Sequence, residues 1–189
     1  MTKKGLRPGG RSARVQEAVH AAVRELERES GRDQLTVPAI AARAGVTPST
    51  IYRRWGDLPQ LLSDVALENL LPDSAPPDTG TFRSDMHAWL AQYLEEMSSE
   101  VGGSLLRDVL LGADPMNAGQ CAHCIEEQLD VMRERALARG EAPPDCDRLM
   151  DYVIAPLIYR ILFGAQKPTY EFALASFERV MAETLDVAA

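Results

Sequence analysis

The sequence predicts an all-α protein in two helical parts, and three observations lead to this prediction. Apolar residues recur at helical spacing along most of the 189 residues, and we read no strand among them. The segment LPDSAPPDTGT, residues 71–81, holds three prolines and little apolar content, which favours a linker between two domains. The charges are also unevenly divided, because residues 1–56 are basic and residues 57–189 are acidic.

This charge division is large enough to bear on function. Residues 1–56 hold 11 Lys and Arg against 5 Asp and Glu, a net charge of +6. Residues 57–189 hold 9 Lys and Arg against 23 Asp and Glu, a net charge of −14. A basic N-terminal part on an acidic body indicates that only the N-terminal part meets a polyanion.

The overall composition is that of an ordinary globular protein, with 46% hydrophobic and 25% charged residues. No apolar run approaches the roughly 20 residues that a membrane helix needs. The basic N-terminus MTKKGLRPGGRSAR has no apolar core behind it, so we expect no secretory signal. With three cysteines in addition, we expect a cytoplasmic protein.

The N-terminal part begins with a basic arm and a long helix. Residues 1–10, which include Lys3 and Lys4 among glycines, predict a disordered arm. From residue 12 onward, apolar residues fall on one face of a helix that ends before Gly31.

Three shorter helices follow, and each has a start signal. Thr36 predicts the N-cap of the second helix, and Gly45 ends that helix because a tight turn there needs a positive φ. Thr47 predicts the cap of the third helix, and Asp57 predicts the cap of the fourth. We therefore predict one domain over residues 11–70.

Residues 82–189 predict a second domain that is also helical. Five helical stripes of apolar residues begin near Phe82, Leu105, Cys121, Met150 and Phe172. Glycines and prolines separate the stripes, and we expect Pro156 to kink the fourth helix.

The second and third helices form a candidate helix-turn-helix, joined through AGVT at residues 44–47. Gly45 suits the short turn that such a pair needs, and Ala41 lets the two helices approach closely. Val46 and Ile51 are placed to hold the third helix against the others. Many helix pairs joined by a glycine turn do not bind DNA, so the pair alone is weak evidence. The charge division and the polar face of the third helix favour DNA binding.

The N-terminal half of the third helix is small and polar, as entry into the DNA major groove requires. Ile51, Trp55 and part of Tyr52 are expected to face inward. Hydroxyls reach phosphates or base edges, and arginine reads guanine or binds phosphate, so the sequence leaves these roles open. The residues that we predict to contact DNA are Arg14, Thr36, Thr47, Pro48, Ser49, Thr50, Tyr52, Arg53 and Arg54.

The stretch LTVPAIAARAGVTPSTIYRRWGDLPQLL, residues 35–62, resembles the DNA-binding domain of the TetR family of bacterial transcriptional regulators. The AGVT turn and STIYRRW match the pattern of that family, with Trp55 where phenylalanine is usual, and YRRW is typical of a subgroup. GDLPQLL departs from the usual Ser-Lys pair, so no phosphate contact is carried onto Leu58 or Pro59. The resemblance covers about residues 12–65, and the remainder agrees in its helical architecture.

The resemblance implies a homodimeric repressor that a small molecule releases from a palindromic DNA operator. It also implies that the last two helices form the dimer interface. The alternative is that these helices bury both faces within one chain. The residues that we predict for the dimer interface are Ile154, Leu157, Ile158, Ile161, Phe172, Phe177, Val180 and Met181.

Aromatic and methionine side chains of the C-terminal part suit an adaptable apolar cavity for the small molecule. The same residues at helical spacing also suit an ordinary core. The residues that we predict to line the cavity are Met86, Trp89, Tyr93, Met97, Leu110 and Met132.

The motif CAHC, residues 121–124, is the strongest candidate for other chemistry. A zinc site needs four ligands, and the sequence has no second cluster, so we expect no metal and no cofactor. We expect Cys121 and Cys124 to fill the core as small apolar side chains, with a thiol-sensing regulator as the alternative. An enzyme is disfavoured, because the sequence has no Gly-rich phosphate loop and no nucleophile elbow.

Overall fold

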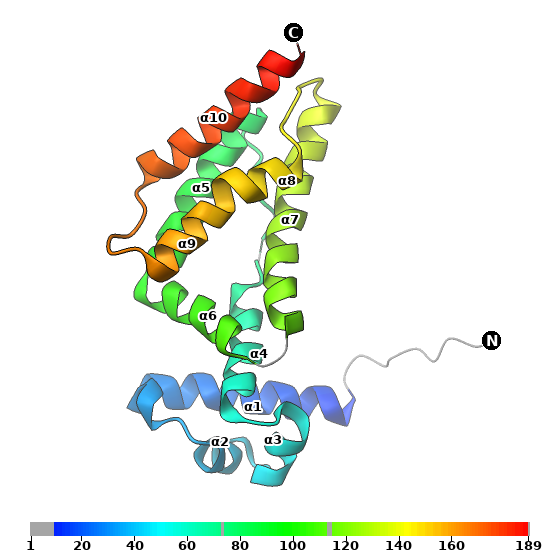
Figure 1. Cartoon of the computed structure of the whole chain (residues 1–189). Helices are drawn as coiled ribbons and strands as arrows, with labels where there is room; N and C mark the ends of the chain where they lie inside the picture. The colour runs from blue at the N-terminus through cyan, green and yellow to red at the C-terminus, as the bar shows by residue number, and fades with distance from the viewer. Residues whose placement is uncertain (1–9, 73, 113–114, 189) are drawn as a thin grey trace, which may run out of the picture.

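The computed structural model describes residues 10–72, 74–112 and 115–188, and the regular structure in these ranges is entirely helical. This confirms the all-α fold class. Apart from Gly10, the predicted basic arm lies outside the described residues. Figure 1 shows one group of helices at the bottom and a taller group of helices above it. No helix in the described ranges is long and apolar enough to span a bilayer.

We call the lower group, α1 to α4, the head. Its elements are α1 (Arg11–Ser30), a 3-10 turn (Arg32–Gln34), α2 (Val37–Ala44), α3 (Pro48–Trp55) and α4 (Leu58–Leu70). Figure 1 shows α1 lying across the head with α2 and α3 beneath it. The apolar faces of all four helices meet in one core. Its buried side chains are Val19, Ala22, Val23, Leu35, Val37, Ile40, Ala41, Ile51, Trp55, Leu61 and Val65.

The predicted caps of α2 and α4 are present. The side-chain oxygen of Thr36 accepts a hydrogen bond from the backbone N–H of Ala39 at 3.3 Å. Asp57 accepts one from the backbone N–H of Gln60 at 2.9 Å. Each bond satisfies an N–H that has no partner within its own helix, and so fixes where the helix begins.

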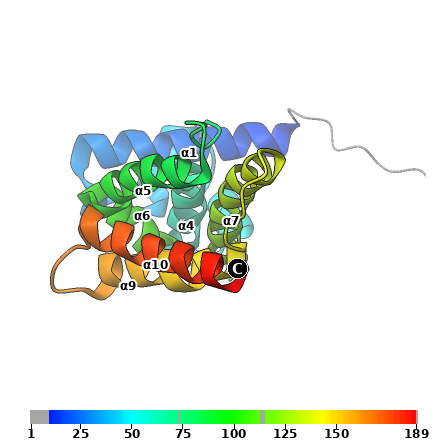
Figure 2. The same cartoon turned by 90° about the horizontal axis from the view of Figure 1, so that it is seen from above.

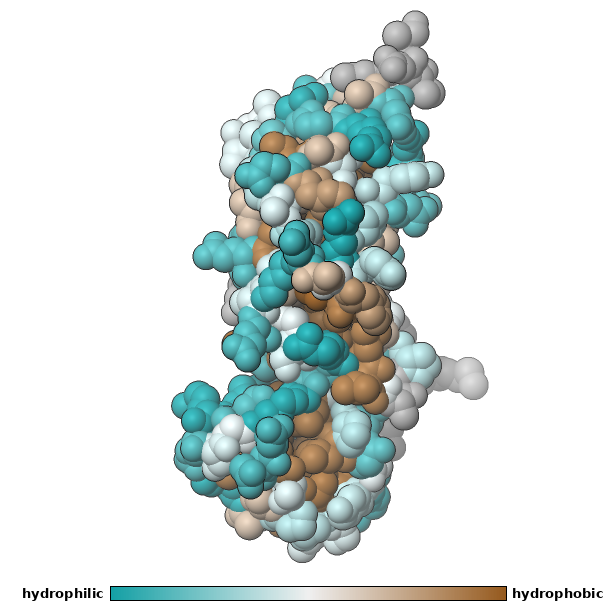
Figure 3. Space-filling model, turned by 60° about the vertical axis from the view of Figure 1, so that its left-hand side comes forward, coloured by the Kyte–Doolittle hydropathy of each residue, from teal (hydrophilic) through white to brown (hydrophobic). Residues whose placement is uncertain are grey.

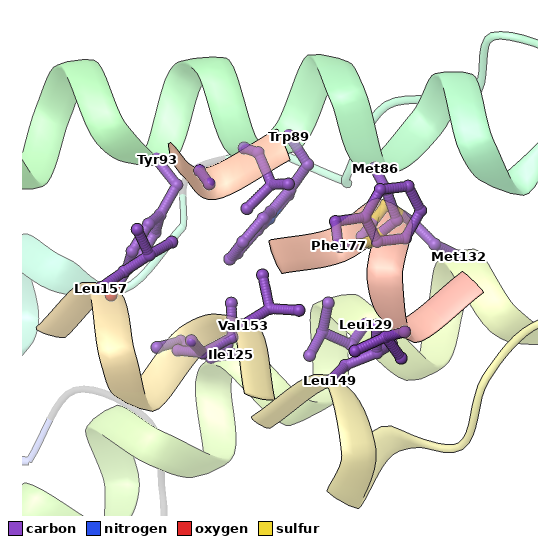
Figure 4. Packing of buried hydrophobic residues seen from close by; sticks show 14 of the residues in the cluster. Met86, Trp89, Tyr93, Ile125, Leu129, Met132, Leu149, Val153, Leu157 and Phe177 are labelled. Atoms are coloured by element: carbon purple, nitrogen blue, oxygen red, sulfur yellow. The ribbon is translucent and has the colours of Figure 1, made fainter. Parts of the chain in front are cut away.

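We call the upper group, α5 to α10, the body. Its elements are α5 (Phe82–Ser98), α6 (Glu100–Leu111), α7 (Pro115–Ala138), α8 (Cys146–Leu149), a π-helical turn (Met150–Ile154), α9 (Ala155–Phe163) and α10 (Tyr170–Ala188). Seen from above, α10 runs beside α5 (Figure 2). The core of the body lies between α5, α7, α9 and α10, where Figure 4 shows Phe177 beside Met86.

The irregularity that Pro156 predicts takes the form of a π-helical turn. The chain widens over Met150–Ile154 and then continues as α9. Pro156 stands in the first turn of α9, where its missing N–H leaves a carbonyl upstream without its usual partner. Single π turns of this kind commonly absorb such a defect within a helix.

Helix α4 belongs to both the head and the body, and Figure 1 shows it rising from one into the other. Ala66 and Leu67 of α4 pack against Val109 of α6. The hydroxyl of Ser63 donates to the carbonyl oxygen of Val109 at 3.4 Å and accepts from the side-chain amide of Asn117 at 2.9 Å. These contacts fix the C-terminal half of α4 to the body.

Two prolines of the predicted linker, Pro76 and Pro77, lie against the body. Pro76 is buried. The guanidinium of Arg135 donates to the carbonyl oxygens of Pro76 and Pro77 at 3.0 and 3.1 Å. The segment is therefore tied to α7 rather than free between two domains.

The structure places most residues of the predicted dimer interface inside the single chain. Ile158 and Phe172 are half-buried, and the other six residues are buried within the single chain, because the body uses both apolar stripes for its own core. A buried side chain has no surface left for a partner subunit. These six residues are Ile154, Leu157, Ile161, Phe177, Val180 and Met181.

Candidate nucleic-acid interface and ligand cavity

The turn between α2 and α3 depends on Gly45. Its backbone is left-handed, with φ 66° and ψ 31°, which confirms the positive φ predicted from the sequence. The N–H of Val46 donates to the carbonyl oxygen of Ala41 at 3.0 Å and closes the end of α2. A Cβ at position 45 would meet no atom within 4 Å, so backbone conformation rather than space favours glycine here.

Helix α3 has one buried and one exposed face. Ile51 is fully buried and Trp55 is 7% exposed, which confirms that both face inward. On the other side Tyr52 is 50% exposed, and Ser49 and Arg53 are exposed as well. The buried pair anchors α3, while its polar residues face outward, as the sequence predicts.

Three hydroxyls gather at the N-terminus of α3. The hydroxyl of Thr47 lies 3.0 Å from the hydroxyls of both Ser49 and Thr50. Thr47 occupies the N-cap position, but its side chain makes no cap hydrogen bond, which corrects the predicted cap. Pro48 follows in the exposed first turn. Hydroxyls and free N–H groups at the positive end of a helix suit a phosphate group.

Arg54 is placed differently from the prediction that it faces DNA. One of its nitrogens donates to the backbone oxygen of Ser12 at 2.9 Å and to the hydroxyl of Ser12 at 2.8 Å, and another donates to Gln16. Its guanidinium also lies 5.1 Å from the centre of the Trp55 ring. Arg54 therefore holds α3 against the start of α1.

Arg53 and Arg14 remain available for an anion. Both side chains are exposed, and no side-chain hydrogen bond or ion pair joins either of them to a residue that the structure describes. Arg53 lines a hollow between α1 and α3, together with Thr47, Thr50 and Arg54. Four predicted DNA-contact residues thus meet at one place, whereas Thr36 lies exposed at the start of α2.

A buried histidine, which no sequence pattern predicts, connects α1 to α4. His20 is 1% exposed, its Nε2 lies 3.1 Å from a carboxylate oxygen of Asp64, and its Nδ1 is bonded to Glu68. Burial lowers the pKa of His20, but hydrogen bonds to the two carboxylates outweigh it and raise the pKa above its usual value. The same bonds lower the pKa of Asp64 and of Glu68.

The body contains a cavity of about 310 Å³ between α5, α7, the end of α4 and the linker segment. Trp89 and Tyr93 line it as a stacked pair, with ring centres 4.8 Å apart and planes 12° from parallel. The indole N–H of Trp89 donates to the side-chain oxygen of Gln128, another lining residue, at 2.8 Å. Figure 4 shows both rings projecting from α5 toward Ile125 of α7.

The structure places three of the six predicted cavity residues, Trp89, Tyr93 and Met97, around this cavity. Met86 and Met132 are instead fully buried in the core, and Leu110 is 55% exposed on α6, so these three do not line it. Sequence reasoning missed the lining residues Asn69, Leu70, Pro72, Pro76 and Gln128. They come from α4, the linker and α7, and no periodic pattern connects these segments.

Cys121 and Cys124 are half-buried and line the cavity, and Cys121 also packs against the small core of Ala66, Leu67 and Val109, as the sequence predicts for it. Burial raises the pKa of both thiols, so they are protonated at neutral pH and weak as nucleophiles, which disfavours thiol sensing. His123 points away from them and pairs with Glu126 and Glu127. The described residues contain no group of three or more His, Cys, Asp or Glu side chains that could hold a metal ion.

Comparisons with known proteins agree with this arrangement. Residues 19–65 match the family model described as bacterial regulatory proteins of the tetR family. Residues 76–180 match the tetracyclin repressor-like C-terminal domain. The HTH-type transcriptional regulator AqdR of Rhodococcus erythropolis is 31% identical over 172 residues, which cover 87% of this chain and 83% of that protein. An uncharacterized HTH-type transcriptional regulator of Mycobacterium tuberculosis is 29% identical over 188 residues, covering 94% of this chain and 91% of that protein.

Solved structures share the fold. The TetR family transcription regulator SCO0332 superimposes with a TM-score of 0.65 at 25% identity, covering 89% of this chain and 97% of that chain. A TetR-family regulator from Mesorhizobium loti superimposes with a TM-score of 0.59 at 17% identity, covering 92% and 98%. The chain therefore belongs to the TetR family of bacterial transcriptional regulators, which bind DNA through a helix-turn-helix and are not enzymes.

Proposed function

We propose that this protein is a homodimeric repressor that a small molecule releases from a palindromic operator. The observation that carries the proposal is the division of α3, whose Ile51 and Trp55 are buried while its hydroxyls and Arg53 face outward. In this proposal residues 11–70 bind DNA in the cytoplasm, and residues 82–189 bind the ligand and form the dimer. The YRRW sequence of α3 supports membership of the subgroup that the sequence resembles.

The DNA contacts follow from the exposed face of α3. Thr47, Ser49 and Thr50 meet phosphates or base edges, and Tyr52 and Arg53 lie one turn further along the groove. Arg14 at the start of α1 adds a phosphate contact, as Thr36 and Pro48 do in the first turns of α2 and α3. Arg54 acts mainly by holding α3 in place, because its nitrogens are bonded to α1.

Helix α4 provides the connection between ligand and DNA. Its C-terminal residues Asn69 and Leu70 form part of the cavity wall, and its Asp64 and Glu68 are bonded to His20 of α1. A ligand that displaces the end of α4 therefore shifts the helix on which α1 rests. Such a shift changes the spacing of the two α3 helices in a dimer, and half-site spacing is what a palindromic operator selects.

The dimer forms through a stripe of exposed aromatic residues rather than through the core residues predicted from the sequence. Tyr152, Tyr159 and Phe163 are 61%, 65% and 69% exposed, and they follow one face of the π turn and α9. Tyr159 and Phe163 pack with ring centres 5.4 Å apart. Large exposed aromatic side chains on one helix face are typical of an interface.

The decisive experiment is a gel shift with DNA from the region upstream of the protein's own gene. We expect the wild type to retard this DNA at low salt, and Arg53→Ala to bind at least ten times more weakly. Arg179→Ala removes an exposed arginine on the body and is the matched control, with no effect expected. Absence of any binding by the wild type at low salt would overturn the proposal.

A further inference from the structure

The cavity in the body restricts the chemistry of what it can hold. We propose that it binds an uncharged, flat ring compound that carries a hydrogen-bond acceptor. This inference rests on the proposed function, because it names the class of small molecule that would release the operator. Shape, hydrogen bonding and charge each support it.

The shape of the cavity favours a flat ring. Trp89 and Tyr93 are stacked nearly parallel and line the same space, so they offer aromatic surface that is already ordered. Trp89 is held further by its bond to Gln128. A planar ring stacks on such a surface with little loss of conformational freedom, whereas a puckered ring of equal size loses part of the contact. The volume of about 310 Å³ lies at the small end of ligand pockets.

The hydrogen-bonding groups favour an acceptor on the ligand. The hydroxyl of Tyr93 is buried and has no hydrogen-bond partner in the described part of the chain. Cys121, which also lines the cavity, is its near neighbour. Because a buried hydroxyl without a partner is costly, a ligand carbonyl or ring nitrogen that accepts from Tyr93 is favoured. The amide of Gln128 supplies further N–H donors on the same wall.

The charges of the lining disfavour an anion. Among the described lining residues there is no lysine or arginine, and the one charged side chain is that of Glu96. A carboxylate or phosphate in this cavity would lose hydration without gaining a cationic partner. Binding of anionic molecules therefore requires a different site.

The test uses the full-length protein without DNA and three probes of equal size, measured by titration calorimetry. 2-Naphthamide is flat and neutral, 2-naphthoate is its anionic counterpart, and decahydronaphthalene-2-carboxamide is its puckered counterpart. We expect 2-naphthamide to bind at least tenfold more tightly than 2-naphthoate and several-fold more tightly than the puckered amide. Equal or tighter binding of either counterpart would overturn the inference, and so would binding of none of the three.

Two pairs of variants locate the effect. Tyr93→Phe should weaken the binding of 2-naphthamide about 3- to 10-fold. Tyr170→Phe is the control and should leave this affinity unchanged, because the hydroxyl of Tyr170 binds the backbone oxygen of His87 instead. Glu96→Gln should reduce the preference of the cavity for 2-naphthamide over 2-naphthoate. Glu95→Gln, outside the cavity, should leave this preference unchanged. Unchanged affinity in Tyr93→Phe contradicts the inference. These titrations need no operator, so a failed gel shift and a wrong ligand class give different results.

Discussion

Asp64 accepts a hydrogen bond of 2.8 Å from the indole N–H of Trp55, and the same carboxylate oxygen lies 3.1 Å from His20. One carboxylate of α4 thus connects the recognition helix α3 to α1. Trp55 therefore does more than fill the place of the usual phenylalanine, because its indole N–H also binds the carboxylate of Asp64 on α4.

Trp55→Phe tests this connection, because it keeps an aromatic ring and removes the N–H. We expect the free energy of unfolding to fall by about 1.5–3 kcal/mol, since the lost bond has a charged acceptor. Urea denaturation measures the change, and Tyr52→Phe, on the exposed face of the same helix, is the control with no loss expected. Equal stability of Trp55→Phe and the wild type would show that the bond contributes nothing.

His20 makes stability depend on pH. Its raised pKa means that the folded state binds the ring proton more tightly than the unfolded state does. This stabilisation is complete below the unfolded pKa of about 6.5 and is lost as the pH rises through the higher folded pKa. We expect the free energy of unfolding of the wild type to decline as the pH rises above about 6.5, and the decline to be smaller in His20→Gln.

Thermal and urea unfolding across this pH range measure the effect. His123→Gln, which changes an exposed histidine, should keep the wild-type profile. The lowered pKa values of Asp64 and Glu68 act in the opposite window, because their stabilisation is lost as the pH falls through those values. An identical slope in His20→Gln above pH 6 would rule out the histidine as its source.

Arg53 and Arg54 should give different results although they are neighbours. Arg53→Ala should weaken operator binding without changing the melting temperature, because the Arg53 side chain is exposed and forms no hydrogen bond or ion pair with a described residue. Arg54→Ala should lower both the affinity for the operator and the melting temperature, because it releases α3 from Ser12 and Gln16. If Arg53 binds a phosphate, its loss should reduce the slope of log K against log salt concentration by about 1. If Arg53 reads a base, its loss should reduce the discrimination between DNA sequences by about 1–3 kcal/mol.

Introducing charged side chains into the aromatic stripe tests the proposed dimer interface. Tyr159→Glu combined with Phe163→Glu should convert the dimer to monomers in sedimentation velocity, because two carboxylates would be buried against their symmetry mates. Leu137→Glu changes a side chain on α7 that is 57% exposed, and should leave the dimer intact. A double variant that stays dimeric would place the interface on another face. One alternative is the middle of the molecule, where α6 exposes Val101 and Leu111 and Figure 3 shows apolar surface.

Local signals in the sequence were sufficient to predict the helices and the turn. Thr36 and Asp57 cap the helices that they were expected to cap, and Gly45 has the positive φ that its place requires. Such features depend on neighbours within four residues, which a sequence displays directly. The inward orientation of Ile51 and Trp55 followed in the same way from their spacing.

The site residues that the sequence did not predict depend on distant partners. His20 lies 44 residues from Asp64, and Arg54 lies 42 residues from Ser12, so no local pattern reveals either bond. Most residues of the predicted dimer stripe lie inside the single chain, because α9 and α10 carry more apolar residues than one face needs. Sequence alone does not say which of two apolar faces the chain buries for itself.

The place of α4 between cavity and head has a thermodynamic consequence. Since one helix of 13 residues, about 20 Å long, contributes to both sites, the two binding equilibria share a single element. In the proposed function, linkage works in both directions, so DNA weakens the binding of the ligand by the same factor by which the ligand weakens the binding of DNA. A DNA-bound protein is accordingly a poorer detector of its ligand than a free one, so the unbound fraction in the cell sets the concentration at which the response begins.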